Sequence, residues 1–128
     1  MVASPGHPLR RVLRTSLDLF AGIRVRDLAA ARAWYARLLG SEPSFLPNDT
    51  EAVWEVAEHR FVYIAQDPAR AGNALMTVFV DDLDTVVADI ASRHLEPANR
   101  ETYSNGVRKV TYRDPDGNEI GFGGAPMD

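Results

Sequence analysis

The chain has 128 residues, enough for one domain of ordinary size, and its 18 acidic and 14 basic residues give a net charge of -4. Because the arginines are scattered along the sequence, an electrostatic grip on DNA or RNA is not expected. The absence of cysteine excludes disulfides, thiolate nucleophiles and thiolate metal ligands. No stretch approaches the roughly 20 apolar residues of a membrane span. We therefore expect a cytoplasmic protein without a membrane or nucleic-acid partner.

The first residues carry basic side chains but no apolar run of the length that a signal peptide needs. We expect a flexible tail over residues 1–15, which includes His7. A single domain is expected to follow over residues 16–128.

A strand followed by a helix occurs twice in the chain. The stretch "IRVRDLAAARAWYARLLGSEP" (23–43) matches "VFVDDLDTVVADIASRHLEP" (78–97), and the offset at the start is 55 residues (78 minus 23). A repeat this long, present in two copies, indicates a duplicated supersecondary module. In each copy apolar residues alternate first with a period of two and then recur at three-to-four spacing, which predicts a strand and then a helix.

The ends of the two helices have their own signals. Asp27 and Asp82 are expected to cap the helix N-termini, because a carboxylate accepts hydrogen bonds from the unpaired backbone N–H groups there. Gly40 predicts a left-handed end to the first helix. His94 is expected near the end of the second helix as a partner of the helix dipole, and Trp34 fits the buried face of the first helix.

Short strands are expected after each helix. In module one, about residues 18–66, they lie around "PSFLP", "EAVWEVA" and "RFVYIAQ". In module two, residues 74–124, they lie around "PANRETY", "VRKVTYR" and "NEIGFGG", with "SNG" (104–106) as a hairpin turn. "QDPARAGN" (66–73) is the expected linker. The prediction is an α+β fold of two tandem βαβββ modules, which form a curved, partly open, antiparallel, barrel-like sheet around a cavity.

The last expected strand is unusually bare. In "DPDGNEIGFGG", Gly121 and Gly123 alternate with Ile120 and Phe122, so the large side chains are expected on the helix side. One interpretation is that the cavity side is left empty, which would widen a pocket for an organic ligand. The alternative is that the glycines allow a bend or bulge. "DPDGN" itself is typical of a turn, and no chemistry is expected from it.

The repeat, "VRDL...YARLLG", "VDDLD" and "DPDGNEI" together resemble the vicinal oxygen chelate superfamily. This superfamily contains glyoxalase I, extradiol dioxygenases, fosfomycin-modifying transferases and bleomycin resistance proteins. The resemblance extends from Phe20 to Gly124 and implies the fold, but one fold hosts many reactions.

The resemblance also implies where a divalent metal would be bound, through His and Glu side chains on four strands. Here those positions are Phe20, Leu75, Gly121 and, depending on the register, Tyr63 or Ala65. None of them offers the usual ligand, so we expect no cofactor, and a divalent metal only if the strand register is misjudged.

Alternation along the strands gives a set of residues that could line a ligand-binding cavity: Phe20, Arg24, Trp54, Tyr63, Leu75, Thr77, Phe79, Glu101, Lys109, Glu119 and Gly121. Catalytic residues are not identified, and the candidates for acid–base chemistry are Glu55, His59, Tyr63 and Glu119. His59 is expected to be exposed in a hairpin turn, and Trp54 fits either the core or a stacking contact with a ligand.

Two main functions remain open, and the first is the favoured interpretation. The first is a metal-independent binding protein of the bleomycin resistance type, which holds a small planar or cationic organic molecule between aromatic side chains and carboxylates. The second is a lyase, isomerase or dioxygenase-like enzyme that uses acid–base residues or a non-standard metal site. A structural or regulatory protein that has lost the site is a third possibility. Because relatives pair as two-fold dimers, a homodimer is expected, with Trp54 or Phe45 at the interface.

Overall fold

The computed structural model describes residues 17–126, so the expected tail and His7 lie outside the described residues. Two modules follow each other in the predicted βαβββ order. Module one contains β1 (Leu19–Val25), α2 (Leu28–Leu39), β2 (Phe45–Asn48), β3 (Glu51–Ala57) and β4 (Arg60–Gln66). Module two contains β5 (Leu75–Val80), α3 (Leu83–Ser92), β6 (Asn99–Thr102), β7 (Arg108–Arg113) and β8 (Glu119–Gly124). Neither helix within residues 17–126 has the length and apolar character needed to cross a membrane.

The helices begin and end where the sequence predicts. The Asp27 carboxylate accepts a hydrogen bond from the Ala30 N–H at 3.2 Å, and Asp82 accepts one from the Thr85 N–H at 3.1 Å. The hydrogen bonds from Thr85 hold the pKa of Asp82 below its ordinary value. Gly40 ends α2 in the left-handed conformation with φ of 82°, a conformation that glycine adopts without steric cost. The capping predictions are confirmed.

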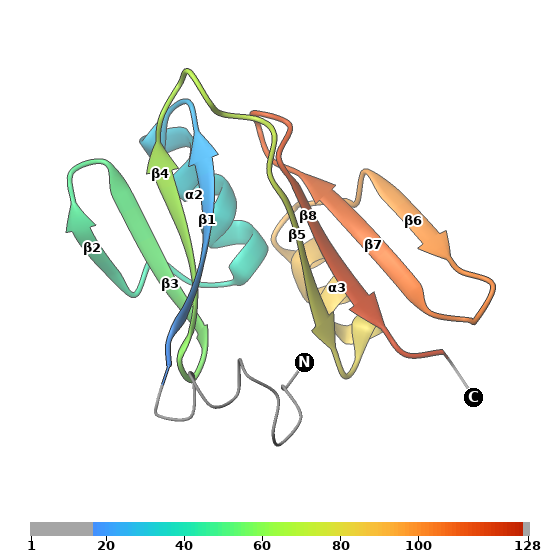
Figure 1. The fold of residues 1–128 in the computed structure, drawn as a ribbon. Coiled ribbons are helices and arrows are strands. Elements are labelled where there is room, and N and C mark those ends of the chain that lie inside the picture. The colour runs from blue at the N-terminus through green and yellow to red at the C-terminus, as the bar shows by residue number, and fades with distance from the viewer. Residues whose placement is uncertain (1–16, 127–128) are drawn as a thin grey trace, which may run out of the picture.

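Each module forms one four-stranded sheet, with strand orders β1-β4-β3-β2 and β5-β8-β7-β6. In Figure 1 the edge strands β2 and β6 lie at the outer sides of the molecule, and β1 and β5 lie at its centre. The predicted α+β fold with open sheets is confirmed, with one refinement. The pairs β1–β4 and β5–β8 are parallel, so each sheet is mixed rather than purely antiparallel.

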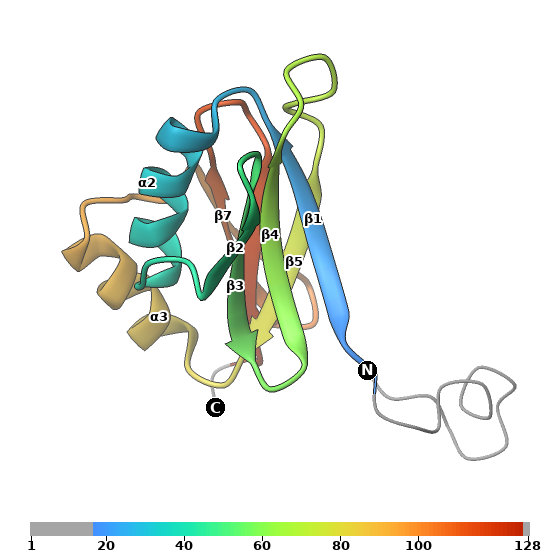
Figure 2. The same cartoon turned by 90° about the vertical axis from the view of Figure 1, so that its left-hand side faces the viewer.

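Both helices lie on the same side of the sheets (Figure 2). The opposite surface is called the helix-free face below. Strand alternation and register place on it, in module one, Phe20, Gly22, Arg24, Phe45, Glu51, Val53, Glu55, Phe61, Tyr63 and Ala65. In module two it carries Leu75, Thr77, Phe79, Asn99, Glu101, Lys109, Thr111, Arg113, Glu119, Gly121 and Gly123.

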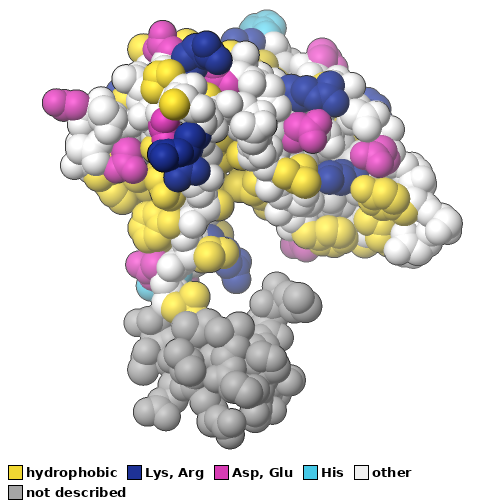
Figure 3. Space-filling model, turned by 45° about the horizontal axis from the view of Figure 1, so that its top comes forward, with side chains coloured by type: hydrophobic (Ala, Val, Ile, Leu, Met, Phe, Trp, Pro, Cys, Tyr) yellow, Lys and Arg dark blue, Asp and Glu magenta, His cyan; other side chains and the backbone are white. Residues whose placement is uncertain are grey.

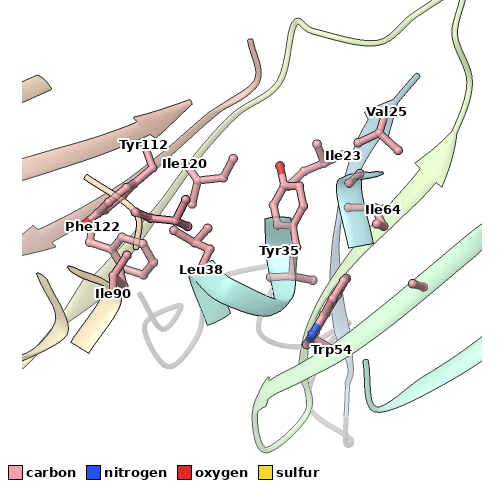
Figure 4. Close-up of a cluster of buried hydrophobic side chains, with 14 of the residues drawn as sticks. Ile23, Val25, Tyr35, Leu38, Trp54, Ile64, Ile90, Tyr112, Ile120 and Phe122 are labelled. Atoms are coloured by element: carbon pink, nitrogen blue, oxygen red, sulfur yellow. The ribbon is translucent and has the colours of Figure 1, made fainter. Parts of the chain in front are cut away.

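A single hydrophobic core on the helix side joins the modules. Tyr35 and Leu38 of α2 lie between the sheet-one residues and the module-two residues of this core (Figure 4). Ile120 and Phe122 are 0 % and 6 % exposed, so the large residues of the bare strand face the core as predicted. Burying one such side chain stabilises the fold by about 1.5–3 kcal/mol, so this core is the principal link between the modules.

The turn before β8 forms a second link. The buried Asp114 carboxylate accepts hydrogen bonds from the Tyr35 hydroxyl and the Asn118 amide, both at 2.8 Å. The same amide donates to the Arg24 carbonyl at 3.0 Å, and its oxygen accepts from the Ala74 N–H at 2.9 Å. The turn prediction is therefore confirmed, but the turn also holds β1, α2 and the linker together. Burial, together with the Asp114 carboxylate, raises the pKa of Tyr35 far above its ordinary value.

Two arginines form a third link by exchanging hydrogen bonds between the helix ends. Arg37 donates to the carbonyl oxygens of Arg93 and His94, at 3.1 and 2.8 Å. In return, Arg93 donates to the carbonyl oxygens of Arg37 and Leu38. The last carbonyls of a helix lack partners within the helix, and here each helix is capped by the other. His94 was expected to serve the helix end through its ring, but the structure uses its carbonyl oxygen.

Candidate functional site

Aromatic side chains cover the helix-free face of module one. Phe20 of β1 stacks on Phe61 of β4 with ring centroids 4.4 Å apart and an angle of 8° between the planes. Tyr63 meets Phe20 edge-on at 6.3 Å, and Phe45 meets Phe61 at 6.5 Å. Phe20 and Phe45 are each 46 % exposed. The cluster therefore presents ring surface to the outside, although aromatic side chains usually bury theirs.

Gly22 allows this arrangement. It lies directly beside Tyr63 in the parallel β1–β4 pair, and a Cβ atom at position 22 would lie 2.6 Å from the tyrosine ring. The hydroxyl end of the Tyr63 ring therefore covers Gly22, where any larger residue would displace it.

In module two the same face combines glycine with a lysine and a phenylalanine. A Cβ atom at position 121 would lie 2.6 Å from Cε of Lys109, and one at position 123 would lie 3.0 Å from the Phe79 ring. The expectation that the cavity side of these glycines is empty is wrong at both positions. Neighbouring strands supply long side chains that cover the bare strand, which glycine permits because it has no side chain of its own.

Several charged residues of the helix-free face have a polar partner. Arg24 lies 3.3 Å from the Asp67 carboxylate, and Arg113 lies 3.0 Å from Glu119. Glu101 accepts a hydrogen bond from the Asn99 side chain at 3.3 Å. The two ion pairs are half-exposed and stabilise the fold little, but they reduce the charge that Arg24 and Glu119 can offer a ligand. The Asn99 amide is neutral, so Glu101 keeps its charge.

The residues at the metal positions implied by the family do not fit a divalent ion. Phe20, Leu75 and Gly121 have no donor atom in their side chains, and neither does Ala65. Tyr63 has a hydroxyl, but it stands alone among them. Within residues 17–126 no three His, Asp or Glu side chains lie close enough together to hold a metal ion. The donor set of a catalytic metal centre, with several N or O ligands and an open position, is not present at these positions.

The candidate acid–base residues do not form one group. Glu119 belongs to sheet two, whereas Glu55 and Tyr63 belong to sheet one. His59 lies in the β3–β4 turn, with its side chain 53 % exposed and Nδ1 2.7 Å from the Asp18 carboxylate. It is exposed as expected, and it is bound to this neighbouring carboxylate. Its Nε2 lies 3.4 Å from the Glu58 carboxylate, so its two neighbours are carboxylates outside the candidate set.

Trp54 is a core residue rather than part of the helix-free face. It is 1 % exposed and donates from Nε1 to the Ser41 carbonyl oxygen at 2.8 Å. Trp54 also contributes to the lining of a cleft of about 350 Å³ on the helix side, between the modules. The lining of this cleft is mainly aliphatic and also includes Asp89 and Arg93. Nothing in the sequence pattern indicated this cleft, because it forms between residues of both modules.

Several residues of the helix-free face are not named in the sequence analysis, Phe61 and Thr111 among them. Phe61 has the same strand parity as Tyr63 and so shares its face, a signal that alternation alone supplies. Thr111 lies directly beside Gly121 in the β7–β8 pair and is only 5 % exposed. Its position could not be found without the register of β7, which is set by the turn at residues 104–106.

The space-filling view shows hydrophobic side chains along the lower margins of both halves of the molecule (Figure 3).

Comparison with known proteins agrees with this architecture. Residues 16–122 match the model of the Glyoxalase/Bleomycin resistance protein/Dioxygenase superfamily, so the chain belongs to this superfamily. A glyoxalase/bleomycin resistance protein from Catenulispora acidiphila has a similar structure, with 56% identity and a TM-score of 0.83. The match covers 87% of this chain and 100% of that chain.

More distant structures share the fold. Lactoylglutathione lyase from Agrobacterium tumefaciens has 19% identity and a TM-score of 0.70, over 86% of this chain and 94% of its own. A bleomycin-binding protein complexed with bleomycin has 16% identity and a TM-score of 0.69, over 88% and 100%. Comparison with curated protein sequences gives no match.

Proposed function

We propose that this protein binds a small aromatic molecule on its helix-free face and does so without a metal ion. The observation that carries the proposal is the exposed aromatic cluster. Phe20, at a position where the superfamily places a metal ligand, stacks on Phe61 and remains 46 % exposed. A ring that reaches this cluster gains offset or edge-to-face contacts, which contribute about 0.5–1.5 kcal/mol beyond the area they bury.

The binding proposal is tested by calorimetry on the full chain with a panel of planar aromatic compounds, bleomycin among them because a protein of the same fold binds it. Phe20→Ala is expected to weaken binding by about three- to tenfold, since it removes the stacked ring. Leu19→Ala is the matched control, because Leu19 is the residue of β1 that precedes Phe20, points to the other face and is 63 % exposed. Equal losses in the two variants, or no binding by any compound, would contradict the proposal.

Metal independence is supported by the residue types at the four family positions. Elemental analysis after incubation with manganese, iron, nickel or zinc salts and dialysis is expected to find far less than one ion per chain. A retained ion at about one per chain would show that donors elsewhere, such as His59 and Glu119, hold a metal, and it would favour an enzyme. The cytoplasmic location remains a prediction.

A homodimer is the proposed assembly, with the second copy covering part of the helix-free face. Leu75 and Phe79 are 68 % and 63 % exposed there, and contiguous exposed apolar surface marks interaction sites. Sedimentation of the wild-type chain is expected to show a dimer, and Leu75→Arg is expected to give a monomer. Leu46→Arg, at a residue 51 % exposed on β2, is expected to leave the dimer intact. A monomeric wild-type chain across the micromolar range would refute the dimer.

A further inference from the structure

We propose that Lys109, with Thr77 and Thr111 beside it, binds a carboxylate of the ligand, so that the protein takes an aromatic acid. The inference rests on the proposed function, because module one supplies the aromatic contact and module two the contact with the acid. It replaces the expectation of a cationic ligand held by carboxylates.

The position of Lys109 is unusual within the sheet. Lys109 is the only lysine of the chain and lies half-buried on β7, directly between Glu101 of β6 and Gly123 of β8. Its side chain leans toward β8, because a Cβ atom at position 121 would lie 2.6 Å from Cε and 3.6 Å from Nζ. The ammonium group is thus directed across Gly121 and away from its cross-strand neighbour Glu101.

Lys109 is also the cation of the helix-free face that forms no ion pair with a carboxylate within residues 17–126. Arg24 is paired with Asp67, and Arg113 with Glu119, whereas no ion pair within the described residues includes Lys109. A half-buried ammonium that lacks a counterion is unfavourable, and an anion of the ligand would relieve this cost.

One hydroxyl group lies at the same point, and a second threonine lies on the other neighbouring strand. Thr77 Oγ1 would lie 3.3 Å from a Cβ atom at position 121, and Thr111 lies directly beside Gly121 on the other neighbouring strand. The ammonium of Lys109 and both hydroxyls can donate hydrogen bonds. Because Cε of Lys109 covers Gly121, a carboxylate would lie beside the ammonium group rather than over the glycine, where it can accept from Lys109 Nζ and Thr77 Oγ1, with Thr111 bordering the site.

The two modules differ at matched positions in a way that suits a ligand with two unlike ends. In module one, Gly22 of the first strand lies beside Tyr63 of the last strand. In module two, Thr77 of the first strand lies beside Gly121 of the last strand. The glycine is thus on the first strand in module one and on the last strand in module two. The space beside it is filled by an aromatic ring in module one and by a lysine in module two.

The test uses the full chain and matched sets of compounds. Each set contains an aromatic acid, its amide and the corresponding amine, for example benzoate, benzamide and benzylamine, with two- and three-ring equivalents. Binding is measured by calorimetry for the wild-type chain and for Lys109→Met, which keeps the aliphatic stem over Gly121 and removes the charge. Arg26→Met is the matched control, since Arg26 is exposed and lies outside the helix-free face. Carbon-13 methylation of the single lysine supplies a direct NMR signal from the site.

The acid is expected to bind about tenfold more tightly than its amide, equivalent to about 1.4 kcal/mol, and to shift the methyl signal of Lys109. Lys109→Met should remove this preference and leave amide binding unchanged, and Arg26→Met should preserve it. If acid and amide bind the wild-type chain equally, or if Lys109→Met keeps the preference, the carboxylate site is refuted while aromatic binding stands. If no compound of any set binds, the proposed function itself fails, and the carboxylate site with it.

Discussion

The hydrogen bonds of Asp114 link the two modules. They predict different effects on stability when each of two buried tyrosines is replaced by phenylalanine. The Asp114 carboxylate accepts from the Tyr35 hydroxyl, the Asn118 amide and the backbone N–H groups of Asp116 and Asn118, at 2.8 to 2.9 Å. Tyr35→Phe removes one of these four donors without changing the ring. Hydrogen bonds to charged groups contribute about 1.5–3 kcal/mol, so the free energy of unfolding should fall by that amount.

Tyr112→Phe is the matched control. The Tyr112 hydroxyl is buried as well, but it has no hydrogen-bond partner within residues 17–126. Removing an unsatisfied buried hydroxyl should be neutral or should stabilise the fold by up to about 1 kcal/mol. Both free energies come from urea denaturation followed by circular dichroism, with an unchanged slope as the sign that the two-state comparison holds. If the two variants lose the same stability, or Tyr35→Phe loses less than about 0.5 kcal/mol, the reasoning about the Asp114 link is refuted.

Three further predictions concern pH and the helix ends. Burial raises the pKa of Tyr35 above its ordinary value, so above about pH 10 only the unfolded chain releases that proton. The contribution of this group to the free energy of unfolding is fully present below pH 10 and falls by about 1.4 kcal/mol per pH unit above it. In Tyr35→Phe, the free energy of unfolding should therefore fall less steeply at alkaline pH, by the slope that one proton contributes. His94 has φ of 70° where module one has Gly40. The free energy of unfolding, measured in urea, should therefore rise by about 0.5–1 kcal/mol in His94→Gly and fall by about 1 kcal/mol in Gly40→Ala. Arg37→Met, which leaves the carbonyls of Arg93 and His94 without their donor, should destabilise by about 1–2 kcal/mol, and an unchanged thermal midpoint would argue against capping between the helices.

The helices and their ends could be predicted from the sequence because their signals are local. Asp27 and Asp82 each bind an N–H group three residues away, and Gly40 adopts its left-handed conformation whatever lies elsewhere in the fold. The helix-side placement of Ile120 and Phe122 followed equally from a period of two.

Features that depend on partners distant in the sequence could not be predicted. In β3, Ala52, Val53 and Trp54 are all buried, so alternation does not reveal which face Trp54 takes. Its place in the core depends on Tyr35 beside it and on Ser41, 13 residues away. The Asp114–Tyr35 bond joins residues 79 positions apart, and nothing in "DPDGN" distinguishes it from a turn that merely reverses the chain.

The proposed ligand would contact two sheets that share no hydrogen-bonded strand pair among the described residues. The distance between the aromatic cluster around Phe20 and the ammonium of Lys109 is therefore set on the opposite side of the molecule, by the shared core and the Asp114 link. Tyr35→Phe loosens that link but touches no residue of the helix-free face. This variant should therefore weaken the binding of a two-ended aromatic acid more than the binding of a neutral aromatic compound that contacts module one alone. An equal loss of affinity for both compounds would mean that the two contacts are made within one module.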